Sequence, residues 1–163
     1  MTEPAPLTAP LSTYRSAVLP EWVDYHGHLR DAYYLLLFSL ATDALMDQLG
    51  LDAVGRAATG HSLYTLECHL NFVHEVKLGQ QVEVCTQILG HDNKRLHLNH
   101  SLHLLGEVPL LAASEQLLLN VATAMGRAAP FADAVHDKVA ALARQHQGLT
   151  APQFAGRAIR LAR

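Results

Sequence analysis

The chain has 163 residues, of which 50% are apolar and 17% are charged, and its formal net charge is -3 at pH 7. This composition is typical of one folded domain rather than of a disordered chain. The small negative charge excludes the basic surface that nucleic-acid binding requires, so no nucleic-acid partner is expected. Two cysteines, Cys68 and Cys85, provide no disulfide framework and indicate a reduced, cytoplasmic setting.

The first ten residues carry three prolines and no basic region followed by an apolar run. We therefore expect residues 1–10 to form a flexible lead rather than a signal peptide, and residues 11–163 to form one domain. A first strand is predicted from Ser12 to Leu19, because Pro20 ends it.

A long apolar run from Ala32 to Leu49 predicts a helix, with Asp31 as its N-cap and Gly50 closing it in a left-handed conformation. Apolar side chains occupy nearly every face of this helix, which indicates burial on all sides. Polar residues such as Asp43 interrupt the run, so a membrane span is not expected.

After Gly60 the period of apolar residues changes from 3.6 to 2, which predicts strands. The last three strands are joined by short turns and therefore form an antiparallel meander. The predicted strands are Tyr64–Phe72, Val82–Ile88, Leu96–Leu104 and Leu110–Val121, and a final helix runs from Ala132 to His146. This order predicts an α+β fold, in which a curved antiparallel sheet of about five strands wraps around a long central helix.

Asp24, Gly27 and His28 lie directly ahead of the central helix. A carboxylate at this place can act as a nucleophile or a general base. The backbone N–H groups of Gly27 and His28, helped by the positive end of the helix, can stabilise an oxyanion. Acyl transfer needs both elements, so the three residues are candidate catalytic residues. The alternative is that Asp24 makes an Asx-turn and His28 packs at the helix entrance.

The segment Pro20–Leu29 and the helix behind it resemble the active-site segment of the 4-hydroxybenzoyl-CoA-type hotdog thioesterases. The pattern of that family reads D-x-x-G-H followed by an aliphatic residue, and Phe72–Gly79 and Ala113–Gln116 are also similar to it. The resemblance implies a hotdog fold, hydrolysis of an acyl-CoA thioester without a cofactor, and a homodimer or a tetramer of dimers. Arg30 stands where the family commonly has Asn, so the hydrogen bonding of that Asn is not carried over.

Further segments are similar to the betainyl-CoA thioesterases of carnitine breakdown, including the thioesterase portion of L-carnitine dehydrogenase fusions: Tyr33–Leu35, Ala41–Asp47, Tyr64–Glu67 and Lys94–His97. A betainyl group carries a trimethylammonium, which an aromatic cage holds through cation–π attraction. The candidate substrate-binding residues are Trp22, Tyr25, Tyr33, Tyr34, Tyr64 and Glu67, and the candidate CoA-binding residues are Lys77, Lys94 and Arg95. Simple packing of the tyrosines against the sheet is the alternative.

Eleven histidines raise the question of a metal, but no zinc-ligand spacing accompanies them, so none is expected. His100 and Glu115 each interrupt an apolar strand face, and we expect them to form a buried pair. Two further functions stay open. A hotdog hydratase would need a longer spacing than that between Asp24 and His28, and a non-catalytic acyl-CoA binder would need no base.

Overall fold

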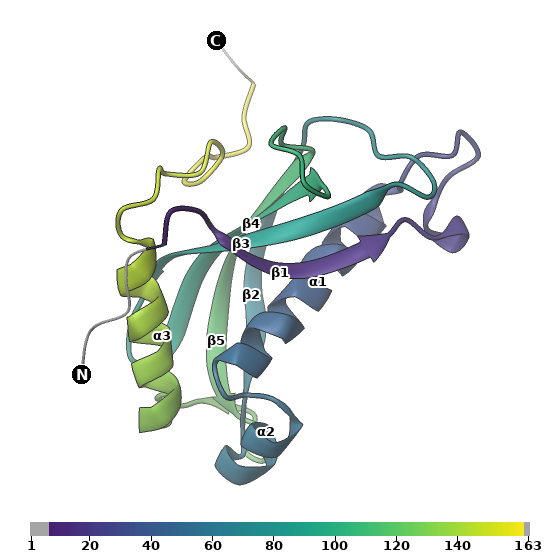
Figure 1. Ribbon diagram of the computed structural model, residues 1–163. Helices are drawn as coiled ribbons and strands as arrows, with labels where there is room; N and C mark the ends of the chain where they lie inside the picture. Colours follow the sequence, from purple (N-terminus) through teal and green to yellow (C-terminus); the bar gives the residue numbers. More distant parts are fainter. Residues whose placement is uncertain (1–6, 162–163) are drawn as a thin grey trace.

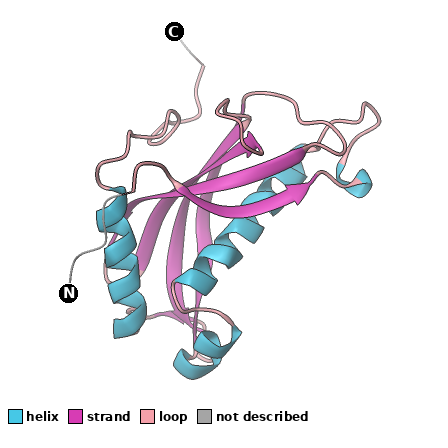
Figure 2. Ribbon diagram, in the orientation of Figure 1, coloured by secondary structure: helices cyan, strands magenta, loops and turns pink. Residues whose placement is uncertain are grey.

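The computed structural model describes residues 7–161 (Figures 1 and 2). The predicted flexible lead therefore lies mostly outside the described residues. The strands are β1 (Leu11–Ala17), β2 (His61–Phe72), β3 (Gln81–His91), β4 (Arg95–Leu104), β5 (Ala112–Ala122) and the short β6 (Arg127–Ala128). The helices are the 3-10 turn η1 (Pro20–Trp22), α1 (Asp31–Gln48), α2 (Ala53–Thr59) and α3 (Asp133–His146).

All strands pair antiparallel in one sheet of order β1-β3-β4-β5-β2, and β6 adds to β5. The sheet curves around α1, which crosses its concave face, while α3 lies beside the far end of the same face (Figure 1). Strands β1 and β2 are the two edges. The predicted α+β hotdog architecture is confirmed, including the antiparallel meander of β3, β4 and β5 and the helix at the C-terminal end.

The inner face of α1 forms the centre of the core, where Leu37, Phe38, Ala41 and Leu45 have no solvent exposure. These side chains join two apolar clusters, one between the first half of α1 and the sheet and one between its second half and α3. Burial of α1 on all sides is wrong for the single chain, because Leu35 is 42% exposed and Leu36 is 36% exposed. A single sheet layer covers only one side of a helix, so the opposite side stays open.

The ends of α1 follow the sequence with one correction. Arg30 occupies the N-cap without a side-chain cap bond, and Asp31 is the first helical residue. The Asp31 carboxylate accepts the Ala32 N–H at 2.8 Å, so it supports the helix start from inside the first turn. Gly50 has a φ of +84°, which confirms the left-handed closing residue. Helix α2 and strand β6 were not predicted, because each is too short to show a period.

The predicted pair of His100 and Glu115 is wrong. The register of β4 with β5 sets His100 opposite Ser114 and Glu115 opposite Asn99, so the two side chains lie on opposite faces of the sheet. His100 faces α1, where its ring nitrogens lie 2.9 Å from the Thr42 hydroxyl and 2.8 Å from the Thr86 hydroxyl. Because both faces of β5 carry apolar residues, the alternation alone did not identify the inner face.

Helix α3 attaches to the sheet beside the start of β1. Beyond Thr86, β3 has no β1 partner, and the Ile88 N–H donates to Nδ1 of the buried His146 at 2.8 Å. Val135 and Val139, one helical turn apart on α3, are buried in the second core cluster. Within residues 7–161 no helix combines the length and apolarity that a bilayer crossing would need.

Candidate functional site

The loop between η1 and α1 closes on the carboxylate of Asp24. Oδ1 of Asp24 accepts the backbone N–H of His26 at 2.9 Å and that of His28 at 3.1 Å. The Asp24 N–H donates to the His28 carbonyl at 2.9 Å, and the Gly27 N–H donates to the Asp24 carbonyl at 3.0 Å. Gly27 has a φ of +75°, a conformation that favours glycine, so this position allows the tight turn.

These hydrogen bonds set the charge of Asp24. The His28 N–H lowers the pKa of the Asp24 carboxyl below its ordinary value of 3.8, with a further contribution from the His26 N–H. The carboxyl is therefore ionised at neutral pH. An ionised carboxylate of low pKa is a weak base but remains able to attack a carbonyl carbon.

A second loop, residues 73–80, clamps the Asp24 loop. The Leu29 N–H donates to the Val76 carbonyl at 2.7 Å, and the Leu78 N–H donates to the Gly27 carbonyl at 3.0 Å. The ring of His28 also reaches this loop, where its Nε2 lies 3.2 Å from Oε2 of Glu75. This contact holds the His28 ring between the two loops. The segment around residue 75, which resembles the family, therefore lies against the Asp24 loop.

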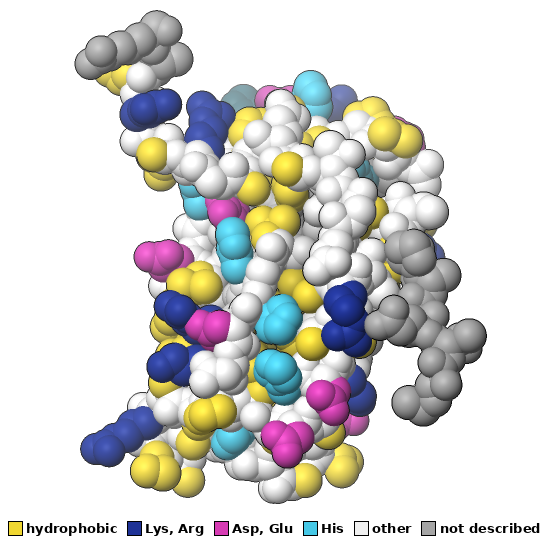
Figure 3. All heavy atoms as spheres, turned by 90° about the vertical axis from the view of Figure 1, so that its left-hand side faces the viewer, with side chains coloured by type: hydrophobic (Ala, Val, Ile, Leu, Met, Phe, Trp, Pro, Cys, Tyr) yellow, Lys and Arg dark blue, Asp and Glu magenta, His cyan; other side chains and the backbone are white. Residues whose placement is uncertain are grey.

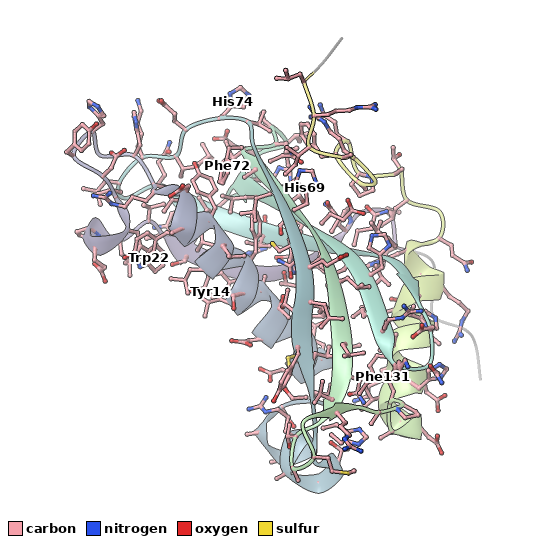
Figure 4. The ribbon with its side chains drawn as sticks, turned by 180° about the vertical axis from the view of Figure 1, so that it is seen from behind. Tyr14, Trp22, His69, Phe72, His74 and Phe131 are labelled. Atoms are coloured by element: carbon pink, nitrogen blue, oxygen red, sulfur yellow. The ribbon has the colours of Figure 1, made fainter. Side chains whose placement is uncertain are left out.

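A cavity of about 280 Å³ opens beside the Asp24 loop. It is lined by Leu29, Asp31, Tyr34, Phe72, Val73, His74 and Glu75. The Tyr34 and Phe72 rings meet edge to face with 5.1 Å between centroids, and the Tyr34 hydroxyl donates to the His74 carbonyl at 3.4 Å. Figure 4 shows Phe72 near the end of β2 and Phe131 at the opposite end of the sheet.

The predicted aromatic cage does not form as one cluster. Trp22 is buried and stacks on Tyr33 with 6.1 Å between centroids, and Tyr25 is 88% exposed beside His26. Tyr64 lies on β2 opposite Leu119. Of the predicted aromatic residues, only Tyr34 lines the cavity. The sequence reasoning missed Phe72, although this residue opens a segment that resembles the family.

Glu67 lines a different and larger cavity, of about 690 Å³, on the outer face of the sheet. There, Nε2 of His97 lies 2.7 Å from Oε1 of Glu115, and Oε2 of Glu115 accepts the Gly156 N–H at 2.7 Å. The C-terminal segment thus covers part of the outer face. Several histidine side chains are also visible on the side of the molecule that carries α3 (Figure 3). The structure does not bring Glu67 to the cavity beside Asp24.

The three predicted CoA-binding cations divide into two places. Lys77 forms a backbone bridge with His28 and therefore lies beside the motif. Lys94 and Arg95 lie at the turn after β3, whereas the Asp24 loop lies near the start of that strand. An extended strand of this length spans about 35 Å, so one chain does not bring all three cations to one site. Arg95 also pairs with Asp92 at 2.6 Å, and hydrogen bonds, the largest from the Lys94 N–H, lower the pKa of Asp92 to about 2.

A hotdog sheet with an Asp-x-x-Gly-His loop ahead of its central helix is the arrangement expected of a hotdog thioesterase. The family model described as the thioesterase-like superfamily matches residues 18–139, and the chain belongs to that superfamily. The predicted class, a thioester hydrolase, is confirmed at this level.

Relatives of known activity match nearly the whole chain. The betainyl-CoA thioesterase of Pseudomonas aeruginosa PAO1 is 60% identical over 151 residues, which are 93% of this chain and 95% of that protein. The L-carnitine dehydrogenase/betainyl-CoA thioesterase of Agrobacterium fabrum C58 is 40% identical over 94% of this chain. The match covers 31% of that longer protein.

Two solved structures share the fold. A candidate thioesterase from Pseudomonas putida KT2440 is 54% identical with a TM-score of 0.83, over 94% of this chain and 98% of that one. The Staphylococcus aureus protein SAV2348, solved in complex with CoA, is 26% identical with a TM-score of 0.87, over 96% of this chain and 98% of that one.

Proposed function

We propose that the chain is an acyl-CoA thioesterase that hydrolyses betainyl-CoA to glycine betaine and free CoA. The observation that carries this proposal is the ionised Asp24 carboxylate, held by two backbone N–H groups at the entrance of α1. The 60% identical relative of P. aeruginosa supports the choice of substrate, because the match extends over 95% of that protein.

Asp24 acts as a nucleophile in this proposal. Its carboxylate attacks the thioester carbonyl, CoA leaves as the thiolate, and water hydrolyses the resulting anhydride and restores the carboxylate. The alternative is that Asp24 takes a proton from an attacking water. The lowered pKa of Asp24 favours attack by the carboxylate itself, because a general base is most effective when its pKa lies near the working pH.

The same loop supplies a donor for the oxyanion. The His28 N–H bonds to Oδ1 of Asp24 at 3.1 Å, so a rotation of Asp24 toward the substrate releases this N–H. The positive end of α1 adds to the stabilisation of negative charge. The Gly27 N–H remains bonded to the Asp24 carbonyl, so Gly27 contributes the shape of the turn. The His28 ring, held near Glu75, positions the loop, and Lys77 is the cation best placed for CoA.

Thiol release from betainyl-CoA tests the proposal directly. We expect Asp24→Asn to lower kcat by at least about a hundredfold, because the variant keeps the size of the side chain and loses its charge. Asp137→Asn, an exposed carboxylate on α3, is the matched control and should keep wild-type turnover. Equal release by the wild type and Asp24→Asn would rule out this mechanism. Binding of acyl-CoA without any release would identify a non-catalytic binder.

A homodimer formed through β2 completes the proposal. Strand β2 is an edge of the sheet, and its residues 64–68 are exposed in a continuous run. Leu66, at 52% exposure, lies in this run. Antiparallel pairing of two copies along β2 would cover this surface and place Phe72 close to the interface. Both free cysteines fit the proposed cytoplasmic location.

Light scattering tests the pairing, with Leu66→Lys as the variant. A lysine on an edge strand opposes sheet extension, so the mass should fall from that of a dimer to that of a monomer. Val54→Lys, which adds the same charge at an exposed position of α2, should leave the mass unchanged. A wild-type mass of one chain would contradict the dimer.

A further inference from the structure

The cavity beside the Asp24 loop combines aromatic rings with carboxylates. Tyr34 and Phe72 line it from α1 and β2, and Asp31 and Glu75 line it from the first turn of α1 and the loop after β2. We propose that this cavity holds the trimethylammonium group of the substrate and that Asp31, Glu75 and Phe72 determine specificity for a cationic acyl group. This inference rests on the proposed thioesterase function.

Aromatic faces suit this group for a chemical reason. A quaternary ammonium has no N–H, so hydrogen-bond acceptors do not recognise it in the way that they recognise a lysine. An aromatic face attracts the diffuse positive charge through its quadrupole. Tyr34 is only 4% exposed and is fixed by its hydrogen bond to the His74 carbonyl, while Phe72 is 53% exposed and offers ring surface at the cavity mouth.

The two carboxylates complete the recognition of charge. The Asp31 carboxylate accepts the Ala32 N–H at 2.8 Å, and the Glu75 carboxylate lies 3.2 Å from the His28 ring. The loop that carries Glu75 is itself held, because the N–H groups of Val73 and His74 both donate to the Leu111 carbonyl. Two carboxylates on tethered backbone therefore face one small space.

The cavity adjoins the loop that carries Asp24, as a short acyl group requires. One methylene separates the ammonium nitrogen of a betainyl thioester from its carbonyl carbon, so the ammonium site must border the catalytic loop. Leu29 and Asp31 line the cavity and follow Asp24 within the same loop and first helical turn. The volume, about 280 Å³, lies just below the range of roughly 300–1,000 Å³ typical of pockets for larger ligands. It is suited to a small acyl group and not to the nucleotide of CoA.

The charges also match the tetrahedral intermediate. Attack on betainyl-CoA produces an oxyanion in a small group that already carries a permanent ammonium charge. The released His28 N–H and the positive end of α1 favour the oxyanion, and Asp31 and Glu75 favour the ammonium. A neutral acyl group gains only the stabilisation of the oxyanion and not that of an ammonium.

The test compares betainyl-CoA with 3,3-dimethylbutyryl-CoA, in which carbon replaces the ammonium nitrogen without a change of shape. We expect the wild type to prefer betainyl-CoA in kcat/KM, and Glu75→Gln and Asp31→Asn each to lower this preference about tenfold. Phe72→Leu should lower it as well. Asp137→Asn, the remote carboxylate control, should keep the wild-type ratio. Unchanged ratios in all three cavity variants would overturn the cation site.

Binding separates this site from catalysis. The probe is an inert ketone analogue of betainyl-CoA, with a methylene between sulfur and carbonyl, measured by calorimetry against its neutral isostere. Tighter binding of the cationic ketone by the wild type, weakened about tenfold in Glu75→Gln, supports the cavity even if no thiol is released from betainyl-CoA. Equal binding of the two ketones overturns the cavity even if betainyl-CoA is hydrolysed.

Discussion

Two regions of the molecule place a histidine beside a glutamate, and their surroundings differ. At the motif, His28 lies near Glu75 between two loops, next to an ionised Asp24 and a cavity with two aromatic rings. On the outer face of the sheet, His97 bonds to Glu115, and the second oxygen of that carboxylate accepts the Gly156 N–H. The same residue pair thus lies beside the proposed nucleophile in one place and anchors the C-terminal segment in the other.

The difference shows that the role of a histidine–glutamate pair depends on the groups that surround it. Near His28 there is a carboxylate whose charge is stabilised by backbone N–H groups, and the positive end of a helix follows. Near His97 the carboxylate has both oxygens occupied, so it is saturated by structural hydrogen bonds. Four measurements test this contrast.

The largest expected difference is between the two histidines. His28→Asn removes the contact with Glu75 and loosens the loop that carries Asp24, so kcat should fall about 10–100-fold. His97→Asn, the matched change on the outer face, should leave kcat within about twofold of wild type. Equal losses in both variants, with both proteins folded by circular dichroism, would remove the functional distinction between the regions.

The pH profile of kcat/KM sharpens the assignment of the reactive group. The pKa of Asp24 is lowered from 3.8, so its carboxylate stays ionised as the pH falls from 8 toward that value. We therefore expect an acid limb below pH 4. A histidine general base of ordinary pKa would give a limb near 6.5. A limb between pH 6 and 7 that persists for a slow substrate would contradict attack by Asp24.

The buried His100 predicts acid sensitivity of the whole fold. Burial lowers its pKa from 6.5 to about 3, so the unfolded chain binds a proton more readily than the folded chain between these values. The stabilisation is complete above pH 6.5 and declines by about 1.4 kcal/mol per pH unit as the pH falls toward 3. Because of this group, the free energy of unfolding measured with urea should be about 1.4 kcal/mol lower at pH 5.5 than at pH 7. Because glutamine does not titrate, the His100→Gln variant should lack this contribution of about 1.4 kcal/mol to the pH dependence of the free energy of unfolding.

Glu115→Gln should have the smallest effect on activity. The change weakens the hydrogen bonds to His97 and to the Gly156 N–H. The free energy of unfolding should therefore fall by about 1 kcal/mol. Turnover should stay at the wild-type level, because the residue lies on the face of the sheet opposite α1. A large loss of turnover without loss of stability would show that the outer face takes part in catalysis.

Sequence reasoning was strongest where a local period or a turn residue decides the structure. The central helix, its end at Gly50, the long strands and the Asp24 motif follow from patterns within a few residues of one another. The cavity did not follow, because it forms where the end of β2 meets the first turn of α1, far apart in the chain. Phe72 and Glu75 lie in a segment that resembles the family, but no local pattern connects them with Asp31 and Tyr34. The orientation of Glu115 also escaped prediction, since both faces of β5 are apolar enough to be the inner face.

The contact between His146 and Ile88 has a consequence for how copies of this chain assemble. The Ile88 N–H lies on β3 beyond the residues that pair with β1. Because it already donates to His146, it is not available as a donor to an incoming strand. Strand addition is thereby opposed along the part of β3 that β1 leaves uncovered. If two copies meet along β2 with two-fold symmetry, each uses up the free edge of the other. The β2 edges of both copies would then be paired, and further strand addition would have to take place at β1, the other edge of each sheet.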